Sequence, residues 1–174
     1  MSNIIVRQAQ IKDAKGLAEV HVLSWKKTYH GLIHQEILDN LSIDTSTSRW
    51  EKMLTTNDPE VTVIVAVQEN KIIGWASYGV NRDEDVTKDT GEIRGIYAHP
   101  DYLGIGVGSK MMEYALEKLI DQGYNKATLW VLTTNTNARE WYTKKGWIIE
   151  GKTKVEKRGE HELHETRYIK DLSS

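Results

Sequence analysis

Hydrophobic and polar residues follow two different periods along the chain, and the change of period separates helices from strands. Apolar residues at spacings of three and four predict helices over residues 13–30, 35–54 with a break near 42–47, 109–122 and 135–145. Runs of β-branched and aromatic residues predict strands over residues 4–8, 61–67, 72–78, 92–98, 127–132, 147–155 and 162–169. We therefore expect an α+β fold (α/β/α layered), with about four helices flanking a mixed, largely antiparallel central sheet of about seven strands.

The element order shows no internal repeat, no low-complexity segment and no linker, so we expect a single domain over residues 1–174. The 23 Lys and Arg residues against 25 Asp and Glu residues give a net charge of −2, and the pI is near 6.3. This balance disfavours nucleic acid as a partner, because binding a phosphate backbone requires a clustered positive field.

The absence of cysteine excludes several classes of chemistry. A chain with Cys 0 has no disulfides, thiolate zinc sites, iron–sulfur clusters or cysteine nucleophile. No apolar run reaches the ~18 residues that a membrane span requires, and the first residues lack the apolar region of a signal peptide. We therefore expect a cytoplasmic protein with no membrane partner.

A glycine-rich turn is the first chemical signal. Gly104, Gly106 and Gly108 separate a strand from an amphipathic helix, so several main-chain N–H groups can converge on an anion there. The spacing matches neither the dinucleotide fingerprint nor the phosphate loop. On spacing alone, a tight turn with close helix–sheet packing remains an equal explanation. Gly95, inside the strand at 92–98, indicates a bulge or a close backbone approach.

Two blocks of sequence together resemble the GNAT superfamily of acetyl-CoA-dependent N-acetyltransferases. Residues 91–112, GEIRGIYAHPDYLGIGVGSKMM, resemble its motif A, and residues 129–147, LWVLTTNTNAREWYTKKGW, resemble its motif B. The resemblance implies a GNAT-like fold and transfer of acetyl from acetyl-CoA to a primary amine of a small molecule or peptide. Leu103 departs from the motif, which usually has Gln or Arg there, and this departure motivates the alternative of a non-catalytic CoA-binding or regulatory module.

The resemblance also implies a cofactor site. The glycine turn would hold the phosphates of CoA, and the strand at 96–98 would pair with the pantetheine arm and polarise the thioester carbonyl through its N–H groups. The cofactor-binding residues implied in this way are Ile96, Tyr97, Ala98, Leu103, Gly104, Ile105, Gly106, Val107, Gly108, Ser109, Asn135 and Ala138.

Acetyl transfer needs a neutral amine and a protonated leaving thiolate. Glu92 stands where the family places its general base; a solvated carboxylate or a partner for Arg94 is the alternative. Tyr142 is the candidate acid, because a phenol of pKa about 10 protonates a thiolate of pKa about 8.5 at little cost. Its alternative is a core aromatic residue on the helix face that Asn135 and Ala138 share. Without cysteine, we expect direct attack in a ternary complex.

The acceptor site is indicated by residues 24–33, which resemble the N-terminal part of many small bacterial members. The substrate-binding candidates are Trp25, Tyr29 and His30, with core packing as the alternative for Trp25 and a surface position for His30. His21, beside the apolar helix face, is expected to be a polar neighbour of the core. The acidic stretch at 83–89 can attract a cationic amine, although a solvated loop is the simpler explanation.

Two histidines near the end of the sequence have a spacing that can suggest a metal site. His161 and His164 resemble a metal box, but three residues apart on a strand they face opposite sides, so we expect no metal. A homodimer is compatible with the sequence.

Overall fold

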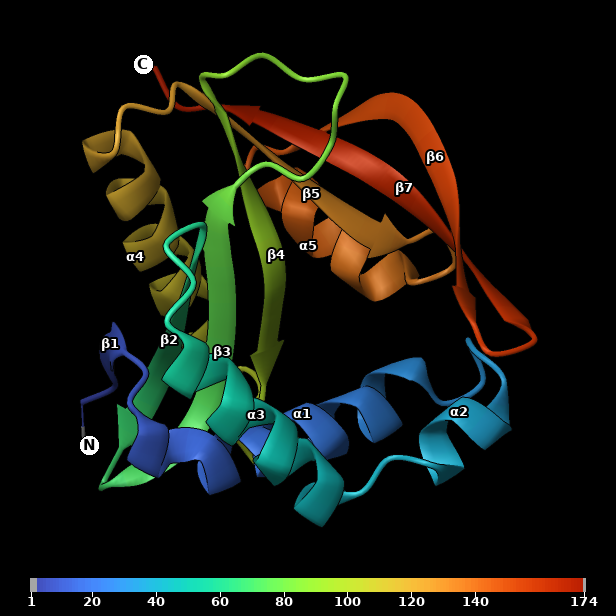
Figure 1. The fold of residues 1–174 in the computed structure, drawn as a ribbon. Coiled ribbons are helices and arrows are strands. Elements are labelled where there is room, and N and C mark those ends of the chain that lie inside the picture. The colour runs from blue at the N-terminus through green and yellow to red at the C-terminus, as the bar shows by residue number, and fades with distance from the viewer. Residues whose placement is uncertain (1–2, 174) are drawn as a thin grey trace.

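The computed structural model describes residues 3–173 and contains one seven-stranded sheet (Figure 1). The strands are β1 (Ile5–Gln8), β2 (Val61–Gln68), β3 (Lys71–Val80), β4 (Thr90–Ala98), β5 (Lys126–Leu132), β6 (Ile148–Arg158) and β7 (His161–Asp171). They lie in the order β1-β2-β3-β4-β5-β7-β6, and every neighbouring pair is antiparallel except β4 and β5. The predicted mixed, largely antiparallel sheet is confirmed.

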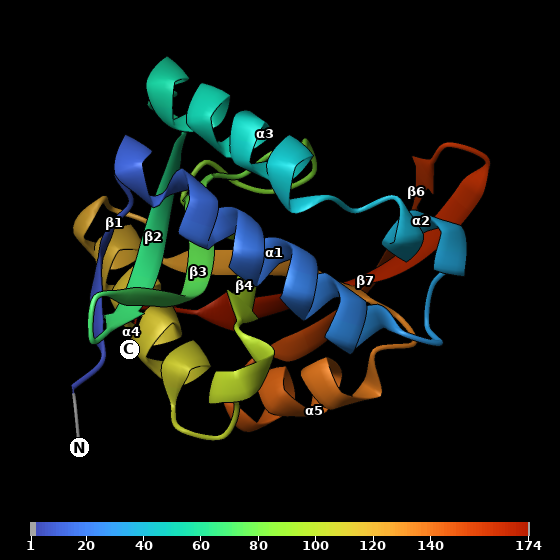
Figure 2. The ribbon, with the colours of Figure 1, turned by 90° about the horizontal axis from the view of Figure 1, so that it is seen from below.

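Helices cover both faces of this sheet. They are α1 (Ala14–Tyr29), α2 (Gln35–Asp39), α3 (Ile43–Thr56), α4 (Val107–Asp121) and α5 (Thr136–Lys144), with short 3₁₀ turns at Ile11–Asp13 and Pro100–Tyr102. Figure 2 shows α1 and α3 on one side of β2 and β3, and α4 and α5 on the other. The layered α+β fold is therefore confirmed, with five helices where about four were expected. No helix within residues 3–173 is long and apolar enough to cross a membrane.

The fifth helix arises because the polar cluster at 42–47 starts a helix instead of interrupting one. The hydroxyl of Ser42 accepts a hydrogen bond from the Thr45 amide at 3.3 Å, which makes Ser42 the N-cap of α3. The interruption lies just before it, between the end of α2 at Asp39 and the start of α3 at Ile43.

Each helical layer has its own hydrophobic core. On the α4 side, Met111 and Leu119 pack with Ile64 of β2, and all three are fully buried. On the α1 side, Leu17 packs with Trp50 of α3 and Trp75 of β3. Burial of these apolar side chains on both faces fixes the sheet between the two helical layers.

The sheet opens between its two parallel strands. β4 and β5 pair only at residues 90–92 with 126–128, and beyond this point they diverge, as Figure 1 shows. A bulge in β4 accompanies the opening, since Ser77 pairs with Gly95 and Tyr78 with Ile93, which leaves Arg94 without a partner on β3. The bulge indicated by Gly95 is confirmed, and a Cβ there would lie 3.0 Å from Trp75 Cη2.

Candidate active site

Two cavities meet where β4 and β5 diverge. The first, of about 660 Å³, lies between these strands, the glycine turn and α5; we call it the strand groove. The second, of about 490 Å³, lies between α1, α3 and the β6–β7 hairpin and is rich in tryptophan; we call it the aromatic pocket. The residues that line both cavities, and so form the wall between them, are Tyr29, Arg94, Tyr97 and Trp130.

The strand groove gathers almost all of the predicted cofactor residues. Those that line it are Ile96, Tyr97, Ala98, Leu103, Gly104, Gly106, Val107, Gly108, Ser109, Asn135 and Ala138. Ile105 is the exception, because its side chain is 50% exposed and lies outside the lining of the groove. Sequence reasoning missed Lys27 and Thr28, which approach the groove from α1.

The glycine turn forms the phosphate-sized end of the groove. Gly104 and Gly106 have φ values of +80° and +89°, in the left-handed region that favours glycine, and a Cβ at either would meet nothing within 4 Å. α4 begins at Val107, two residues earlier than predicted. The backbone N–H groups at the start of the helix, which have no partner within the helix, therefore belong to the glycine turn. This donor set suits an anionic group such as a phosphate.

Asn135 and Leu103 differ in what their side chains can offer to an anionic ligand. The Asn135 Oδ1 atom accepts a hydrogen bond from the Ala138 amide at 3.2 Å and caps α5, which leaves the side-chain NH₂ as the donor. Leu103 lies at the edge of the groove, 57% exposed, and contributes no polar side-chain atom. Anion contacts at this edge are therefore left to the backbone.

Tyr142 lines the groove from α5 and is buried. Its ring packs edge-on against Trp141 and Trp147, with centroids 5.3 Å and 6.3 Å away. Burial raises the pKa of the Tyr142 phenol far above its ordinary value, and Tyr97 adds to the rise. The phenol therefore keeps its proton and acts best as a hydrogen-bond donor, since full transfer of the proton to a thiolate is more uphill than the ordinary pKa implies.

Glu92 is buried in an ion pair. The backbone N–H and the Nε atom of Arg82 donate to Glu92 Oε1 at 3.1 Å and 3.0 Å, and Arg82 Nη2 donates to Oε2 at 2.8 Å. The predicted alternative partner, Arg94, has its Nε atom 4.0 Å from Oε1. Glu92 is 1% exposed and lines neither cavity, so a base role requires the Arg82 pair to open or a relay to intervene.

The aromatic pocket receives two of the three predicted substrate residues. Trp25 and Tyr29, four residues apart on α1, line the same pocket with their ring centroids 4.8 Å apart. His30 is exposed and lies outside both cavities, because α1 ends at Tyr29 and the chain turns away. His21, expected as a neighbour of the core, lines the pocket; burial lowers its pKa to about 4, and Arg158 and Arg49 add to the fall.

Polar atoms without a hydrogen-bond partner gather on this pocket. The buried orphan atoms that belong to its lining residues are His21 Nδ1, Trp25 Nε1, Trp75 Nε1, Arg94 Nε and Glu165 Oε1. Among residues 3–173, Trp147 Nε1 is the one such atom outside it. Buried polar atoms without partners are costly, so this concentration suits a polar ligand.

Two carboxylates of the acidic stretch are held by a buried arginine. Asp83 and Asp85 both accept hydrogen bonds from the Arg167 guanidinium, at 3.1 Å for Asp83 and 2.7 Å and 2.8 Å for Asp85. Arg167 is 2% exposed, and Glu150 also accepts from its Nε atom, at 2.6 Å. A buried arginine therefore pairs with two carboxylates of the stretch, and the attraction of a cationic amine by this stretch stays a prediction.

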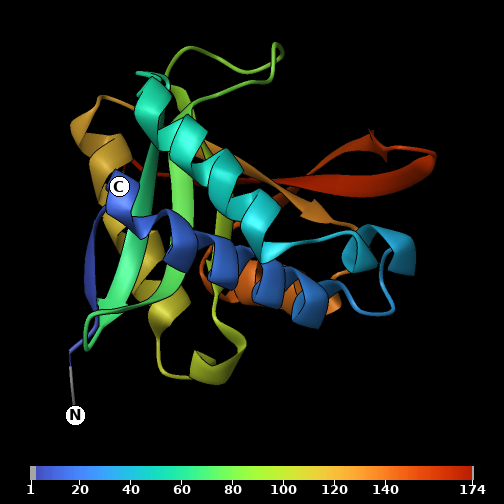
Figure 3. The same cartoon turned by 60° about the horizontal axis from the view of Figure 1, so that its bottom comes forward.

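The histidines of the β6–β7 hairpin separate as expected. His164 is exposed beside Glu162, whereas the His161 ring stacks on His34 with centroids 3.8 Å apart. His161 Nε2 lies 3.2 Å from Glu36 Oε2, so the hairpin is fastened to α2, towards which it extends in Figure 3. His34, Glu36 and His161 bring one possible ligand atom each within 4.8 Å of one another, so this cluster joins the hairpin to the start of α2 and does not include His164.

Comparisons with known proteins agree with this geometry. Residues 19–147 match the model of the Acetyltransferase (GNAT) family. The chain is 31% identical over 133 residues to YuaI, an uncharacterized N-acetyltransferase of Bacillus subtilis (strain 168), covering 76% of this chain and 73% of the relative. It is 22% identical over 153 residues to the spermidine N(1)-acetyltransferase of Thermoplasma acidophilum, covering 85% and 90% of the two chains.

Solved structures share the fold. The crystal structure of the PaiA N-acetyltransferase from Thermoplasma acidophilum, in complex with coenzyme A, superposes with a TM-score of 0.73 at 22% identity, covering 97% of this chain and 99% of that one. The family model, the relatives and the splayed sheet all lead to the same assignment. The chain belongs to the GNAT acetyltransferase family and is an acyltransferase.

Proposed function

We propose that this protein moves the acetyl group of acetyl-CoA to a primary amine of a small molecule or peptide, by direct attack in a ternary complex. Residues 1–174 act as one acetyltransferase domain in the cytoplasm. The observation that carries the proposal is the wall shared by the strand groove and the aromatic pocket, because a donor in one cavity and an acceptor in the other would meet at Tyr29, Arg94, Tyr97 and Trp130.

The residues of the strand groove fit acetyl-CoA. The glycine turn and the first turn of α4 would bind its phosphates, and the unpaired edge of β4 at residues 96–98 would hydrogen-bond its pantetheine arm. Acetyl-CoA supplies the activated acetyl group. The N–H groups of the same edge would polarise its carbonyl, and Tyr142 would donate a hydrogen bond to its sulfur.

The acceptor amine needs a base to become neutral before it attacks. An alkyl ammonium has a pKa of about 10.4, so a proton must be removed before nitrogen can attack. Glu92 stays a prediction for this role, and its ion pair with Arg82 is the obstacle that a relay would have to overcome. A carboxylate with a free oxygen facing the aromatic pocket would meet the need more directly.

The acceptor binds in the aromatic pocket against Trp25 and Tyr29. The cationic side chains that line this pocket, Arg82, Arg94, Lys154 and Arg158, outnumber the carboxylates Glu156 and Glu165. A polycation such as spermidine, the substrate named for the Thermoplasma relative, therefore meets more repulsion than a monoamine does. We propose a monoamine acceptor whose other groups are neutral or anionic.

Thermal shift with CoA and thiol release with an amine panel test the proposed function. We expect CoA to raise the melting temperature and monoamines to give turnover. Leu103, which departs from the motif, motivates the competing function of a CoA-binding or regulatory module. If the wild-type protein binds CoA but releases no thiol with any amine, that function is correct and the proposed activity is wrong.

A further inference from the structure

We propose that Glu165 of β7 is the carboxylate that takes the proton from the acceptor amine, with Glu156 of β6 as the neighbour that tunes it. This inference rests on the proposed acetyl transfer and assigns the base within the same site. No motif of the sequence points to either residue.

The fold turns Glu165 into the aromatic pocket. Leu163, Glu165 and Arg167 alternate along β7, and the burial of Leu163 and Arg167 shows that this set faces inward. Glu165 lies opposite Lys154 on β6 and lines the pocket, and its Oε1 atom is buried without a hydrogen-bond partner in the protein. A buried carboxylate oxygen with a free lone pair is suited to receive an N–H group.

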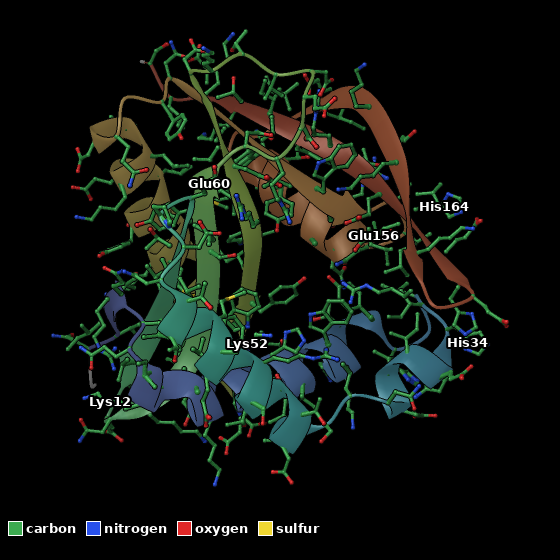
Figure 4. All side chains as sticks on the ribbon, viewed as in Figure 1. Lys12, His34, Lys52, Glu60, Glu156 and His164 are labelled. Atoms are coloured by element: carbon green, nitrogen blue, oxygen red, sulfur yellow. The ribbon has the colours of Figure 1, made fainter. Side chains whose placement is uncertain are left out.

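Glu156 reaches the same side of the hairpin. It lies opposite Leu163, one inward position away from Glu165, and it lines the pocket with Lys154 and Arg158. Figure 4 shows Glu156 pointing from β6 towards the centre of the molecule, whereas His164 lies on the outer side of the hairpin. The two carboxyl groups are therefore close enough to influence each other.

Glu165 also lies near the wall between the two cavities. Its charge raises the pKa of Tyr29 and of Tyr97, both residues of that wall, although burial is the larger cause for each. An amine that attacks a thioester carbon must be at this wall. Glu92, in contrast, has both oxygens engaged by Arg82 and faces neither cavity.

The protonation behaviour of Glu165 supports this geometry. Burial, followed by a hydrogen bond with Glu156 and the charge of Glu156, raises the pKa of Glu165 to about 7, although Lys154 and Arg158 act in the opposite direction. From the other packed elements, the titratable groups whose pKa Glu165 raises are Tyr29 of α1 and Tyr97 of β4, and the charged groups that line the same pocket are Arg82 and Arg94. A base is most effective when its pKa lies near the working pH, so this carboxylate is well matched to neutral conditions.

The protons balance in the proposed step. Glu165 takes one proton from the acceptor ammonium and later releases it to solvent. The neutral nitrogen forms a bond to the acetyl carbon while the bond from that carbon to sulfur breaks. The nitrogen then loses a second proton, which ends on the sulfur. This proton passes directly, or Tyr142 gives its own proton to the sulfur and takes the one from nitrogen. The products are the amide, the thiol of CoA and one proton.

The first test compares Glu165→Gln with Glu162→Gln, an exposed carboxylate on the outer face of the same strand. We expect Glu165→Gln to lower kcat by about 10²-fold or more, because general-base catalysis contributes about 10²–10⁴-fold. CoA should still raise its melting temperature, which shows that the variant is folded. Glu162→Gln should keep the wild-type kcat.

The second test uses the pH profile of kcat with one amine throughout. Wild-type activity should rise through about pH 7, because the base is inactive while protonated. Glu156→Gln removes the neighbour that raises the pKa of Glu165, so the rising limb should move to lower pH. A merely structural role for Glu165 would not produce this shift.

The outcomes separate this proposal from the proposed function. Wild-type turnover combined with a Glu165→Gln variant of unchanged kcat overturns the assignment of Glu165 alone, and loss of kcat in Glu92→Gln would then return the role to Glu92. If the rising limb of the pH profile of Glu156→Gln lies at the same pH as that of the wild type, this result also overturns the assignment of Glu165. Wild-type protein that binds CoA and acetylates no amine overturns the proposed function itself.

Discussion

The hydroxyl oxygens of Tyr29 and Tyr97 lie 2.9 Å apart and share a hydrogen bond across the wall between the strand groove and the aromatic pocket. Tyr29 ends α1, and Tyr97 follows the bulge in β4, so the bond ties the first helix to the diverging strand. Burial raises the pKa of Tyr29 to about 12 and that of Tyr97 well above its ordinary value. Both phenols therefore stay protonated at neutral pH and hold the wall in place.

Loss of either hydroxyl should reveal this coupling. Tyr29→Phe and Tyr97→Phe each leave the other hydroxyl partly buried without its partner, and we expect each to lower the free energy of unfolding by about 1 kcal/mol. The double variant should cost little more than either single one, because both remove the same bond. Urea unfolding of the four proteins measures the cycle; fully additive losses would show that the two hydroxyls are not coupled.

Tyr142→Phe should lower kcat by about 10²-fold while acetyl-CoA binding is retained, because the phenol acts at the leaving sulfur and its ring still packs on Trp141 and Trp147. The raised pKa of Tyr142 adds a second expectation: its deprotonation should cause no loss of activity below about pH 10. Steady-state kinetics and CoA thermal shift measure both. An unchanged kcat would mean that Tyr142 packs in the core and takes no part in catalysis.

Much of the fold could be predicted because its signals are local. The change of hydrophobic period identified all seven strands and the helical regions, and Gly95 marked the bulge beside the splay. The boundary between α2 and α3 was misplaced because a Ser, Thr and Asp cluster both interrupts and starts helices, and only the hydrogen bond from Thr45 to Ser42 distinguishes the two.

The two sides of the site differed in how far sequence could define them. The strand groove takes most of its lining from two contiguous motifs, so all the predicted cofactor residues except Ile105 line it. The aromatic pocket is assembled from α1, α3, β3 and the β6–β7 hairpin, and single residues from distant segments carry no local signal. Glu165 was missed for this reason, although the alternation with Leu163 and Arg167 places it inward once β7 is known.

Gly106→Ala should separate backbone strain from cofactor binding. Gly106 has a φ of +89° and Gly123, at the other end of α4, has a φ of +95°, and neither would crowd a Cβ. Alanine at either position should cost about 1 kcal/mol of unfolding free energy through strain alone. Only Gly106→Ala should also weaken CoA binding, because only Gly106 lines the strand groove. Equal CoA titrations for the two variants would contradict the role of the turn.

The ion pair between Asp85 and Arg167 should make stability depend on acid pH. Hydrogen bonds from Arg167 lower the pKa of Asp85 to about 2, well below the ordinary pKa of an aspartate side chain. A carboxylate whose pKa is depressed by folding stabilises the protein above its unfolded pKa, and this contribution is lost as the pH falls through the folded value. The stability gained from Asp85 should therefore be complete at about pH 5 and decline between about pH 4 and pH 2.

Asp85→Asn removes that titration, so its urea midpoint should fall less than that of the wild type between about pH 5 and pH 2.5. Asp121→Asn, which changes an exposed carboxylate at the end of α4, controls for the loss of one charge and should follow the wild-type curve. The other carboxylates titrate in all three proteins and cancel in the comparison. Parallel curves for wild type and Asp85→Asn would mean that the pair with Arg167 contributes no pH-dependent stability. An unchanged amine KM in Asp85→Asn is also expected, because Arg167 already occupies this carboxylate.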